Sequence, residues 1–567
     1  MESGASGGGG ADRSDRKRLI PSALLTVVLA VAAGGAADAE RATTLTVLFT
    51  SDVHGRVLPF DDVRERPARG SLAQVATLVG RVREEARNVV VLDGGDAIQG
   101  TPLAYYGIAA PGAAGEDPTV AGMNAVGVDA AVLGNHEFNF GLEILGRSIG
   151  QSSFPWLAAN LKGAAAAGLS VGDEIVITRG GVRIGVLGLT NPNIPRWDPP
   201  GHWRGLEFLD PIEIARRRLA TLRARADIVV VVAHTGFERD LDSGEGDDSE
   251  HENFAYRLAQ LEGIDLLLTG HTHRDIAPRQ FGRTVIAQPG RWAEYVTRVD
   301  LSLTRVGRRW RVEGWQGSNL PTGEESADPR VTAAVAGLHE RVNRELARPL
   351  GTLAAPLRLA GAPTADDPSV DLVHAVQLEA TGAQLSLAAP LGGREEFPAG
   401  PLTPRLAHAL YPYPNTLTVV RLSGAQLKDV LEHAVHGWVG VECAVSGCVA
   451  HRDGRVPVYA FDTLAGGTYL VDPQAPAGKR IRGLRVEGRL VGAEETFTVA
   501  INSYRAVGGG HFPHLDTAPR VAEIDRPMVE LLVDFFARRG TVTPGTDDNW
   551  AFTLPLREAV QARPAAR

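Results

Sequence analysis

Five short apolar runs in the first half of the chain each end close to Asp, Asn or His, and this repeated arrangement constrains the fold more than any other feature. The runs cover residues 45–50, 89–92, 130–133, 228–233 and 264–269. They predict buried strands, and the carboxyl ends of parallel strands meet at the edge where open α/β sheets bind ligands. A polar turn would explain any one of these ends, but five in succession predict an α/β fold with a functional site at that edge.

The polar residues after these runs are of the types that bind divalent metal ions. They are Asp52, His54, Asp96, Asn135, His136, His234, His271 and His273. Carboxylate, imidazole and amide oxygen, without thiolate, suit zinc, manganese or iron. So many ligands indicate two ions rather than one, and a carboxylate that bridged them would hold them about 3.5–4 Å apart. Two such ions can bind a phosphoryl group and activate a water molecule, so the sequence predicts a dinuclear hydrolytic site.

The motifs that contain these residues resemble the metallophosphoesterases of the secreted 5′-nucleotidase superfamily. They are DVHG at 52–55, GDAIQG at 95–100, GNHEFNFG at 134–141, AHTG at 233–236 and GHTH at 270–273. The resemblance implies that one ion is held by Asp52, His54, Asp96 and His273. It implies that a second ion is held by the bridging Asp96 with Asn135, His234 and His271. It also implies that His136 contacts the substrate phosphate as a catalytic residue.

One position within these motifs departs from the wider superfamily. Its nucleotidases often place an Asp three residues after the catalytic His, and this chain has Asn139 there. An amide can orient the His136 ring but cannot stabilise an imidazolium by charge. Asn in place of Asp at this position is also typical of one branch of the superfamily, the bacterial 2′,3′-cyclic-nucleotide 2′-phosphodiesterase/3′-nucleotidases, which this chain resembles.

The pattern along the chain also predicts the domain organisation. The pattern of residues 328–348 predicts a helix with one apolar face. In the family that this chain resembles, the corresponding segment is a linker helix about which the second domain turns. We expect residues 40–327 to form a metallophosphoesterase αββα sandwich, and residues 349–558 to form a C-terminal α/β substrate-binding domain. Residues 559–567 are expected to be a tail.

Two tyrosines of the second half lie on loops flanked by Pro or Gly, Tyr413 in YPYPNTL and Tyr504 in NSYRAVGGGHF. A tyrosine on a rigid loop can stack on a planar base, which is worth about 1–3 kcal/mol per base, although either tyrosine alone could simply pack against the protein. In the resembling family two aromatic rings hold the base, so the resemblance assigns this role to Tyr413 and Tyr504 and a base contact to Asn415. Arg394 is a further candidate for phosphate contact.

Four segments resemble the cyclic phosphodiesterase/3′-nucleotidase branch more closely than they resemble 5′-nucleotidases. They are the two tyrosine loops, the GNHEFNFG motif and DDNW at 547–550. The resemblance implies that 2′,3′-cyclic nucleotides are opened to 3′-nucleotides, which are then dephosphorylated. A 5′-nucleotidase or nucleotide-sugar hydrolase on the same scaffold is the first alternative. A secreted binding protein without turnover is the second, and the presence of all seven metal ligands argues against it.

Composition and the amino terminus indicate where the protein acts and on what. The net charge of −9 argues against a nucleic-acid polymer as partner, so a small nucleotide substrate is expected. Arg16–Arg18, the apolar run 19–33 and Ala37-Asp38-Ala39 follow the order of a secretory signal peptide that ends at residue 39. The alternative is an uncleaved anchor helix. The length of the apolar run argues against it, because the run is shorter than the ~20 residues of a membrane-spanning helix. We therefore expect export to a periplasm or the exterior, without a stable membrane anchor; the oligomeric state is not predicted.

Three further segments lead to smaller expectations. Cys443 and Cys448 are the two cysteines of the chain, and in an oxidising compartment they predict a local disulfide, with two free thiols as the alternative. Residues 183–190 predict a core strand with no ligand-like residues of its own. The acidic loop at 240–252 predicts a solvated surface loop, with an ion site as the alternative.

Overall fold

The computed structural model describes residues 42–113, 115–246, 252–359, 365–393, 395–436, 439–444, 447–452, 458–554 and 556–557. The predicted signal peptide, the predicted tail and Arg394 lie outside the described residues. Within the described ranges, no helix has both the length and the apolar character required to cross a bilayer.

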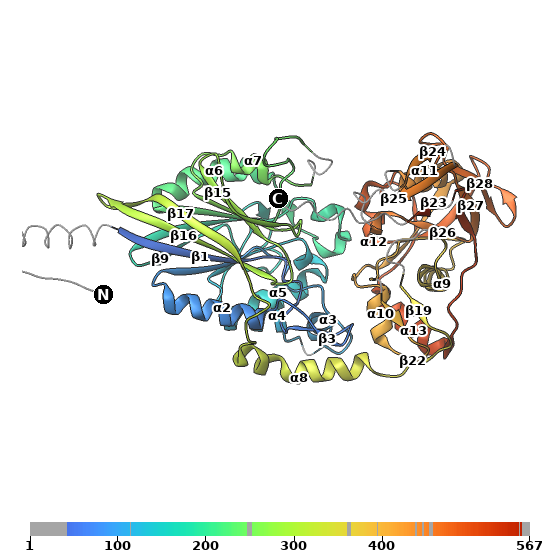
Figure 1. Ribbon diagram of the computed structural model, residues 1–567, viewed down its shortest axis with the longest axis horizontal. Helices are drawn as coiled ribbons and strands as arrows, with labels where there is room; N and C mark the ends of the chain where they lie inside the picture. Colours follow the sequence, from blue (N-terminus) through green and yellow to red (C-terminus); the bar gives the residue numbers. More distant parts are fainter. Residues whose placement is uncertain are drawn as a thin grey trace, which may run out of the picture.

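Two sheets pack face to face in the first domain (Figure 1). The first sheet has the order β17-β16-β1-β4-β5-β6-β8, and the second has the order β14-β15-β13-β12-β10-β9. Apolar side chains of both sheets form one buried core, in which Phe49 and Val90 of the first sheet pack with Val230 and Leu266 of the second. This core forms because the central strands are apolar on both faces, as expected for parallel strands covered on both sides.

The strand bounds confirm the five predicted strands. The first sheet consists of β1 (Ala42–Thr50), β4 (Val89–Asp93), β5 (Ala130–Val132), β6 (Trp156–Leu157), β8 (Val171–Gly172), β16 (Tyr295–Val306) and β17 (Arg309–Pro321). The second consists of β9 (Glu174–Arg179), β10 (Val182–Leu189), β12 (Ile228–Ala233), β13 (Leu266–Thr269), β14 (Asp275–Phe281) and β15 (Thr284–Pro289). β1, β4 and β5 run parallel to one another, as do β10, β12 and β13. The carboxyl ends of the site strands therefore lie together.

Helices cover the outer faces of both sheets. α2 (Leu72–Glu85) and α4 (Pro118–Val126) pack on the first sheet, and α6 (Pro211–Arg225) and α7 (Ala255–Ala259) pack on the second. Side chains cap the first turns of α2 and α6: Ser71 accepts a hydrogen bond from the N–H of Gln74, and Asp210 accepts from the N–H groups of Ile212 and Glu213. The first domain is thus the αββα sandwich that the sequence predicts.

The predicted linker segment forms α8 (Pro329–Leu346), which Asp328 caps. Its buried residues, Val331, Val335, Val342 and Leu346, belong to the same apolar cluster as α2 and α4. Figure 1 shows α8 running along the first domain towards the second. The helix is therefore packed on the first domain over its whole length.

The second domain is also α/β, which confirms the predicted fold class. Its central sheet has the order β26-β20-β30-β23-β31, formed by β26 (Thr463–Ala465), β20 (Leu385–Ala388), β30 (Thr496–Asn502), β23 (Leu417–Ser423) and β31 (Arg520–Ile524). Around it lie α9 (Pro368–Thr381), α10 (Pro404–Leu410), α11 (Gly424–Val435) and α13 (Met528–Arg539). A hairpin of β24 (Val439–Ala444) and β25 (Gly447–Arg452) places the backbone of Cys443 opposite that of Cys448. The disulfide between them stays a prediction.

The two domains meet through apolar and polar contacts around Tyr105. This residue lies in α3 (Pro102–Ile108) of the first domain and contacts the ring of His408 at 5.7 Å between centroids. Its hydroxyl donates a hydrogen bond to Glu530 of α13 at 2.7 Å. Nearby, Arg405 of the second domain pairs with Glu65 of the first at 3.1 Å. These contacts bring the Tyr411–Pro414 loop to the carboxyl edge of the first sheet.

The packing of α8 leads to a stability prediction. Leu346 is fully buried, so Leu346→Ala should lower the free energy of unfolding by about 2–5 kcal/mol through lost burial and a residual cavity. Denaturant unfolding of the purified protein measures this change. Arg344→Ala is the control, because that side chain is 71% exposed and such substitutions usually stay within about 0.5 kcal/mol. An equally small effect of both variants would show that α8 does not pack as described.

Candidate metal centre

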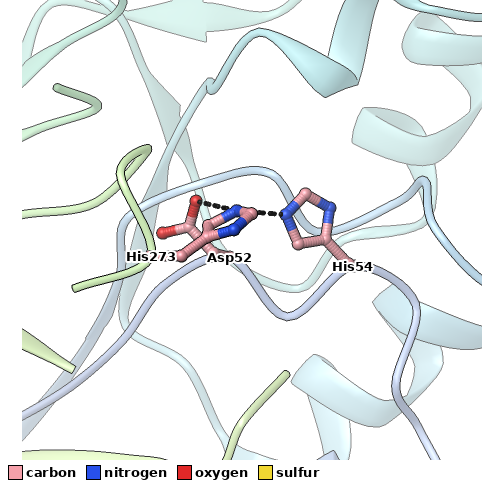
Figure 2. A group of neighbouring side chains, drawn as sticks. All are labelled: Asp52, His54 and His273. Carbon is pink, nitrogen blue, oxygen red and sulfur yellow. Dashed lines mark hydrogen bonds and ion pairs between the residues drawn. The ribbon is translucent and has the colours of Figure 1, made fainter. Parts of the chain in front are cut away.

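The carboxyl ends of β1 and β13 bring together the first group of predicted ligands. Figure 2 shows Asp52, His54 and His273 with their polar atoms facing one another. The Nε2 atoms of His54 and His273 are 2.9 Å apart, and His273 Nε2 lies 3.4 Å from Asp52 Oδ1. Three side chains from two segments that are far apart in the sequence thus lie close enough together to bind one metal ion.

A second group forms at the ends of β4, β5, β12 and β13. His234 Nε2 lies 3.0 Å from Asp96 Oδ2, and His271 Nδ1 lies 2.9 Å from Asn135 Oδ1. Ligand atoms of Asp96, His234 and His271 lie within 4.8 Å of one another, and Asp96 is equally grouped with His54 and His136. Asp96 therefore sits between the two groups, where a bridging carboxylate is expected.

The donor atoms of both groups fit divalent cations. His234 Nε2 is buried and has no hydrogen-bond partner among the described residues, although Asp96 is close. The Nε2 atoms of His54 and His273 face each other at 2.9 Å, and if both present a lone pair, a cation between or beside them is needed to offset the repulsion. A cation beside these nitrogens would satisfy lone pairs that the protein leaves open. The groups differ from ordinary surface acidic clusters in being largely buried.

Backbone carbonyls orient two of the imidazoles. His234 Nδ1 lies 2.7 Å from the carbonyl oxygen of Gly94, and His54 Nδ1 lies 3.1 Å from that of Gln99. A ring whose Nδ1–H donates to a carbonyl presents the lone pair of Nε2 to the site. Both rings are therefore set in the tautomer that binds metal.

The charges of the site favour cations. Burial lowers the pKa of His54 to about 3, so this ring is neutral and able to act as a ligand. Burial also lowers the pKa of His234, but the carboxylates of Asp96 and Asp52 outweigh it and raise the value to about 10. Burial raises the pKa of Asp96, yet the surrounding histidines bring it well below its ordinary value. Asp96 is thus ionised. Its negative charge stabilises a cation at Nε2 of His234, whether that cation is a proton or a metal ion.

Five of the predicted ligands have a backbone conformation that L-residues rarely adopt. Their φ angles are 54° for Asp52, 49° for His54, 56° for Asp96, 69° for His271 and 57° for His273. Such left-handed residues cost about 1–3 kcal/mol each unless the surroundings hold them. Here the loops after β1 and β4 hold each other, because the N–H groups of Asp52 and His54 donate to the carbonyls of Gly95 and Asp96, each at 2.9 Å.

Two buried carboxylates that sequence reasoning did not assign support these loops. Glu137 accepts hydrogen bonds from the backbone N–H groups of Asp96, Ala97 and Gly134 at 2.8, 2.6 and 2.7 Å, and burial raises its pKa. Asp93 accepts from Thr50 Oγ1 at 2.7 Å and from the Gly95 N–H at 2.9 Å, and burial raises its pKa to about 7. The available signal for Glu137 was its place beside His136 inside the GNHEFNFG motif.

His136 borders the site instead of facing its interior. Its Nε2 is 4.0 Å from Asp96 Oδ2, and its side chain remains 24% exposed. Its other ring nitrogen, Nδ1, lies 2.6 Å from Asn139 Oδ1. This placement leaves Nε2 accessible to a molecule bound beside the two ligand groups.

Residues from two unassigned segments contact His271. Glu252 Oε1 lies 2.7 Å from His271 Nε2, so the prediction of a solvated acidic loop is wrong for its last residue. Trp197, which follows β10, stacks on the His271 ring at 5.3 Å with an interplanar angle of 29°. β10 is itself the predicted core strand, but the segment that follows it reaches the site. No motif marks either residue, because both lie well beyond the ends of their strands.

The second domain presents the predicted base-binding tyrosines near this centre. Tyr413 is 40% exposed on the cleft between the domains. That cleft is lined by Gln99, Thr101 and Phe140 of the first domain and by Tyr411, Tyr413 and Pro414 of the second. The ring of Tyr504 rests on Gly509, where an added Cβ would lie 2.5 Å from three ring atoms.

A third tyrosine, Tyr459, was not predicted; it is 43% exposed. Burial, followed by the charge of Glu252, raises the pKa of Tyr459. Burial and the neighbouring Tyr459 likewise raise the pKa of Tyr504. The charge of Glu252, which contacts His271, thus acts on both tyrosines. Asn415 follows Tyr413 closely in the chain, with its Nδ2 3.4 Å from Tyr411 Oη.

Comparison with known proteins connects both domains to described families. Residues 45–275 match the calcineurin-like phosphoesterase family, and residues 349–517 match the 5′-nucleotidase C-terminal domain. The 2′,3′-cyclic-nucleotide 2′-phosphodiesterase/3′-nucleotidase of Salmonella typhimurium is 30% identical over 93% of this chain and 91% of that protein. The trifunctional nucleotide phosphoesterase YfkN of Bacillus subtilis is 29% identical over 92% of this chain. The matched region covers 40% of the length of YfkN.

Solved structures show the same two-domain architecture. A Staphylococcus aureus protein assigned as a 5′-nucleotidase, in complex with α-ketoglutarate, superposes with a TM-score of 0.79 at 28% identity, over 91% of this chain and 100% of that one. The 5′-nucleotidase precursor of Thermus thermophilus shares the fold with a TM-score of 0.64 at 23% identity, over 90% and 99% of the two chains. With its two matched domains and its clustered Asp and His ligands, the chain belongs to the 5′-nucleotidase family of calcineurin-like metallophosphoesterases, enzymes that hydrolyse nucleotide phosphoesters.

Proposed function

We propose that this enzyme opens 2′,3′-cyclic nucleotides to 3′-nucleotides and then removes the 3′-phosphate. The observation that carries this choice is the pairing of His136 with Asn139, at 2.6 Å, where nucleotidases of the superfamily often have an Asp. The relative that bears this double activity in its name is 30% identical across both domains, whereas the Yersinia enterocolitica protein UshA is 24% identical. The pattern of residues 16–39 supports action outside the cytoplasm.

The predicted ligands divide into two sets around Asp96. Asp52, His54, Asp96 and His273 would hold one ion, and Asp96, Asn135, His234 and His271 would hold the other. Their nitrogen and oxygen donors suit zinc, manganese or iron. When bound, two such ions neutralise phosphoryl oxygens and activate a water molecule.

His136 is proposed to act on the substrate directly. Asn139 engages its Nδ1, which leaves Nε2 accessible to the substrate. In the ring that carries a hydrogen on both nitrogens, Nε2 would donate a hydrogen bond to a phosphoryl oxygen or a proton to the leaving oxygen. Either role stabilises negative charge that develops during hydrolysis.

The second domain is proposed to select the nucleotide. Tyr413 and Tyr504 would enclose the base, and Asn415 would contact its edge. Stacking accepts any planar base, so the tyrosines supply affinity while the metal centre and His136 supply chemistry. Arg394 stays a prediction as a phosphate contact. The charge of −9 supports a small nucleotide, not a nucleic-acid polymer, as the partner.

A 5′-nucleotidase or nucleotide-sugar hydrolase is the competing function. The superposition on the Staphylococcus aureus protein assigned as a 5′-nucleotidase favours this alternative. It requires the same metal ligands and differs in which ester the second domain presents to them. A binding protein without turnover fits less well, because all seven ligands are present and clustered.

Substrate preference tests the proposed function. With manganese added, the mature protein should hydrolyse 2′,3′-cyclic AMP and 3′-AMP with higher kcat/KM than 5′-AMP. Phosphate release and chromatography of the products measure this, and 3′-AMP should be an intermediate of the cyclic substrate. A preference for 5′-AMP would leave the metal centre intact but refute the proposed specificity.

Substitution of His136 tests its proposed role separately from metal binding. His136→Ala should retain the metal content of the wild type and lose about 10²–10⁴-fold in kcat, the usual contribution of a general acid. Elemental analysis and steady-state kinetics on the same preparation give both quantities. Full activity of His136→Ala would show that the residue has no catalytic role.

A further inference from the structure

A buried carboxylate that no motif marks lies behind Asn139. Asp198 is 3% exposed and belongs to the segment between β10 and α6, between the short 3₁₀ helices η2 (Ile194–Arg196) and η3 (Pro200–His202). Asn139 Nδ2 donates a hydrogen bond to Asp198 Oδ1 at 2.9 Å. Asp198 therefore contacts the same side chain that engages the catalytic histidine.

The chemistry of the three groups fixes the direction of both hydrogen bonds. A carboxylate can only accept, so Asn139 must turn its NH₂ group towards Asp198. Its carbonyl oxygen then faces His136 Nδ1 at 2.6 Å, and because that oxygen can only accept, Nδ1 must carry the hydrogen. With an uncharged or apolar residue at position 198, the amide could rotate and present NH₂ to His136, which would favour the opposite tautomer.

The surrounding segment is anchored well enough to hold this arrangement. The N–H of Asp198 donates to the carbonyl of Ile194 at 3.0 Å, and Trp203 Nε1 donates to the carbonyl of Asp198 at 3.1 Å. His202 Nδ1 lies 3.4 Å from Asp198 Oδ1. The neighbouring Trp197 stacks on His271, so one segment supports residues of the metal centre and of the catalytic histidine.

The carboxylate of Asp198 is not engaged by a stronger partner. Among the described residues, its Oδ2 is buried and accepts no hydrogen bond. The side chains that meet the carboxylate are Asn139 and His202, and no Arg or Lys of the described part forms an ion pair with it. The contact with Asn139 is thus its principal interaction.

We propose that Asp198 is a positioning residue for catalysis, which acts through Asn139 to fix the orientation of the His136 ring and to keep a hydrogen on its Nδ1, so that Nε2 faces the substrate. It would supply, one side chain further away, the constraint that an Asp beside the histidine supplies in other nucleotidases of the superfamily. This inference rests on the catalytic role of His136 in the proposed function.

An exchange of the two side chains tests the proposal. Asp198→Asn should lower kcat on the preferred nucleotide by about 10–100-fold, the usual effect of removing a supporting hydrogen-bond partner, with KM and metal content unchanged. The double variant Asn139→Asp/Asp198→Asn should recover much of this loss, because the carboxylate introduced at position 139 would accept directly from His136 Nδ1. A purely structural Asp198 would give no such recovery.

Controls separate this role from stability and from the proposed function. Asp117→Asn is the matched control, because Asp117 is a buried carboxylate that caps α4 away from the site; it should lower the melting temperature and leave kcat unchanged. Wild-type kcat in Asp198→Asn, loss of metal from it, or no recovery in the folded, metal-loaded double variant would overturn the proposal. An inactive His136→Ala with a fully active Asp198→Asn refutes only this inference, whereas an active His136→Ala refutes the catalytic assignment itself.

A measurement on the wild type does not depend on how the variants fold. In the holoenzyme labelled with ¹⁵N-histidine, the His136 resonances, identified by their loss in His136→Ala, should show a protonated Nδ1. An unprotonated Nδ1 in a neutral ring would overturn the proposal.

Discussion

The carboxylate of Glu137 holds the functional edge of the first domain together. It accepts hydrogen bonds from three backbone N–H groups on the loops after β4 and β5, and it does so where water is excluded. Loss of one partner in such a position leaves buried polar groups unsatisfied, which costs about 1–3 kcal/mol for each. These bonds hold the left-handed backbone of Asp96, and the carbonyls of Gly95 and Asp96 in turn accept from the N–H groups of Asp52 and His54. The geometry of the metal ligands therefore depends on a residue that is not itself proposed as a ligand.

Contacts with neighbouring residues also orient the histidines of the site. Carbonyl groups of Gly94 and Gln99 orient His234 and His54, Trp197 and Glu252 hold His271, and Asn139 with Asp198 holds His136. Each of the imidazoles of His54, His234 and His136 has one nitrogen engaged by the protein, which leaves the other for an ion or a substrate. The second domain contributes Tyr411 and Tyr413 to the cleft between the domains, and the contacts of Tyr105 with His408 and Glu530 join the two domains beside it.

The sequence was sufficient to predict the α/β fold and the candidate metal ligands, because apolar runs mark strands and the polar residues at their carboxyl ends share an edge. It could not reveal the roles of Glu137 and Asp93, since a carboxylate that binds backbone N–H groups has the same local pattern as one that faces a metal. Asp198 and Glu252 were missed for a different reason. They reach the site from long loops, and a loop has no periodicity that relates a residue number to a position in space. The packing of α8 on the first domain likewise required the structure, since an apolar stripe shows that a helix packs but not on what.

The proposed hydrolysis depends most on two ions that share Asp96, and elemental analysis of the metal-loaded protein combined with anomalous diffraction tests this directly. We expect two ions per chain, both in contact with the Asp96 carboxylate, and we expect Asp96→Ala to lose bound metal as well as activity. A single ion, or two ions retained in full by Asp96→Ala, would contradict the dinuclear centre on which the proposed chemistry rests.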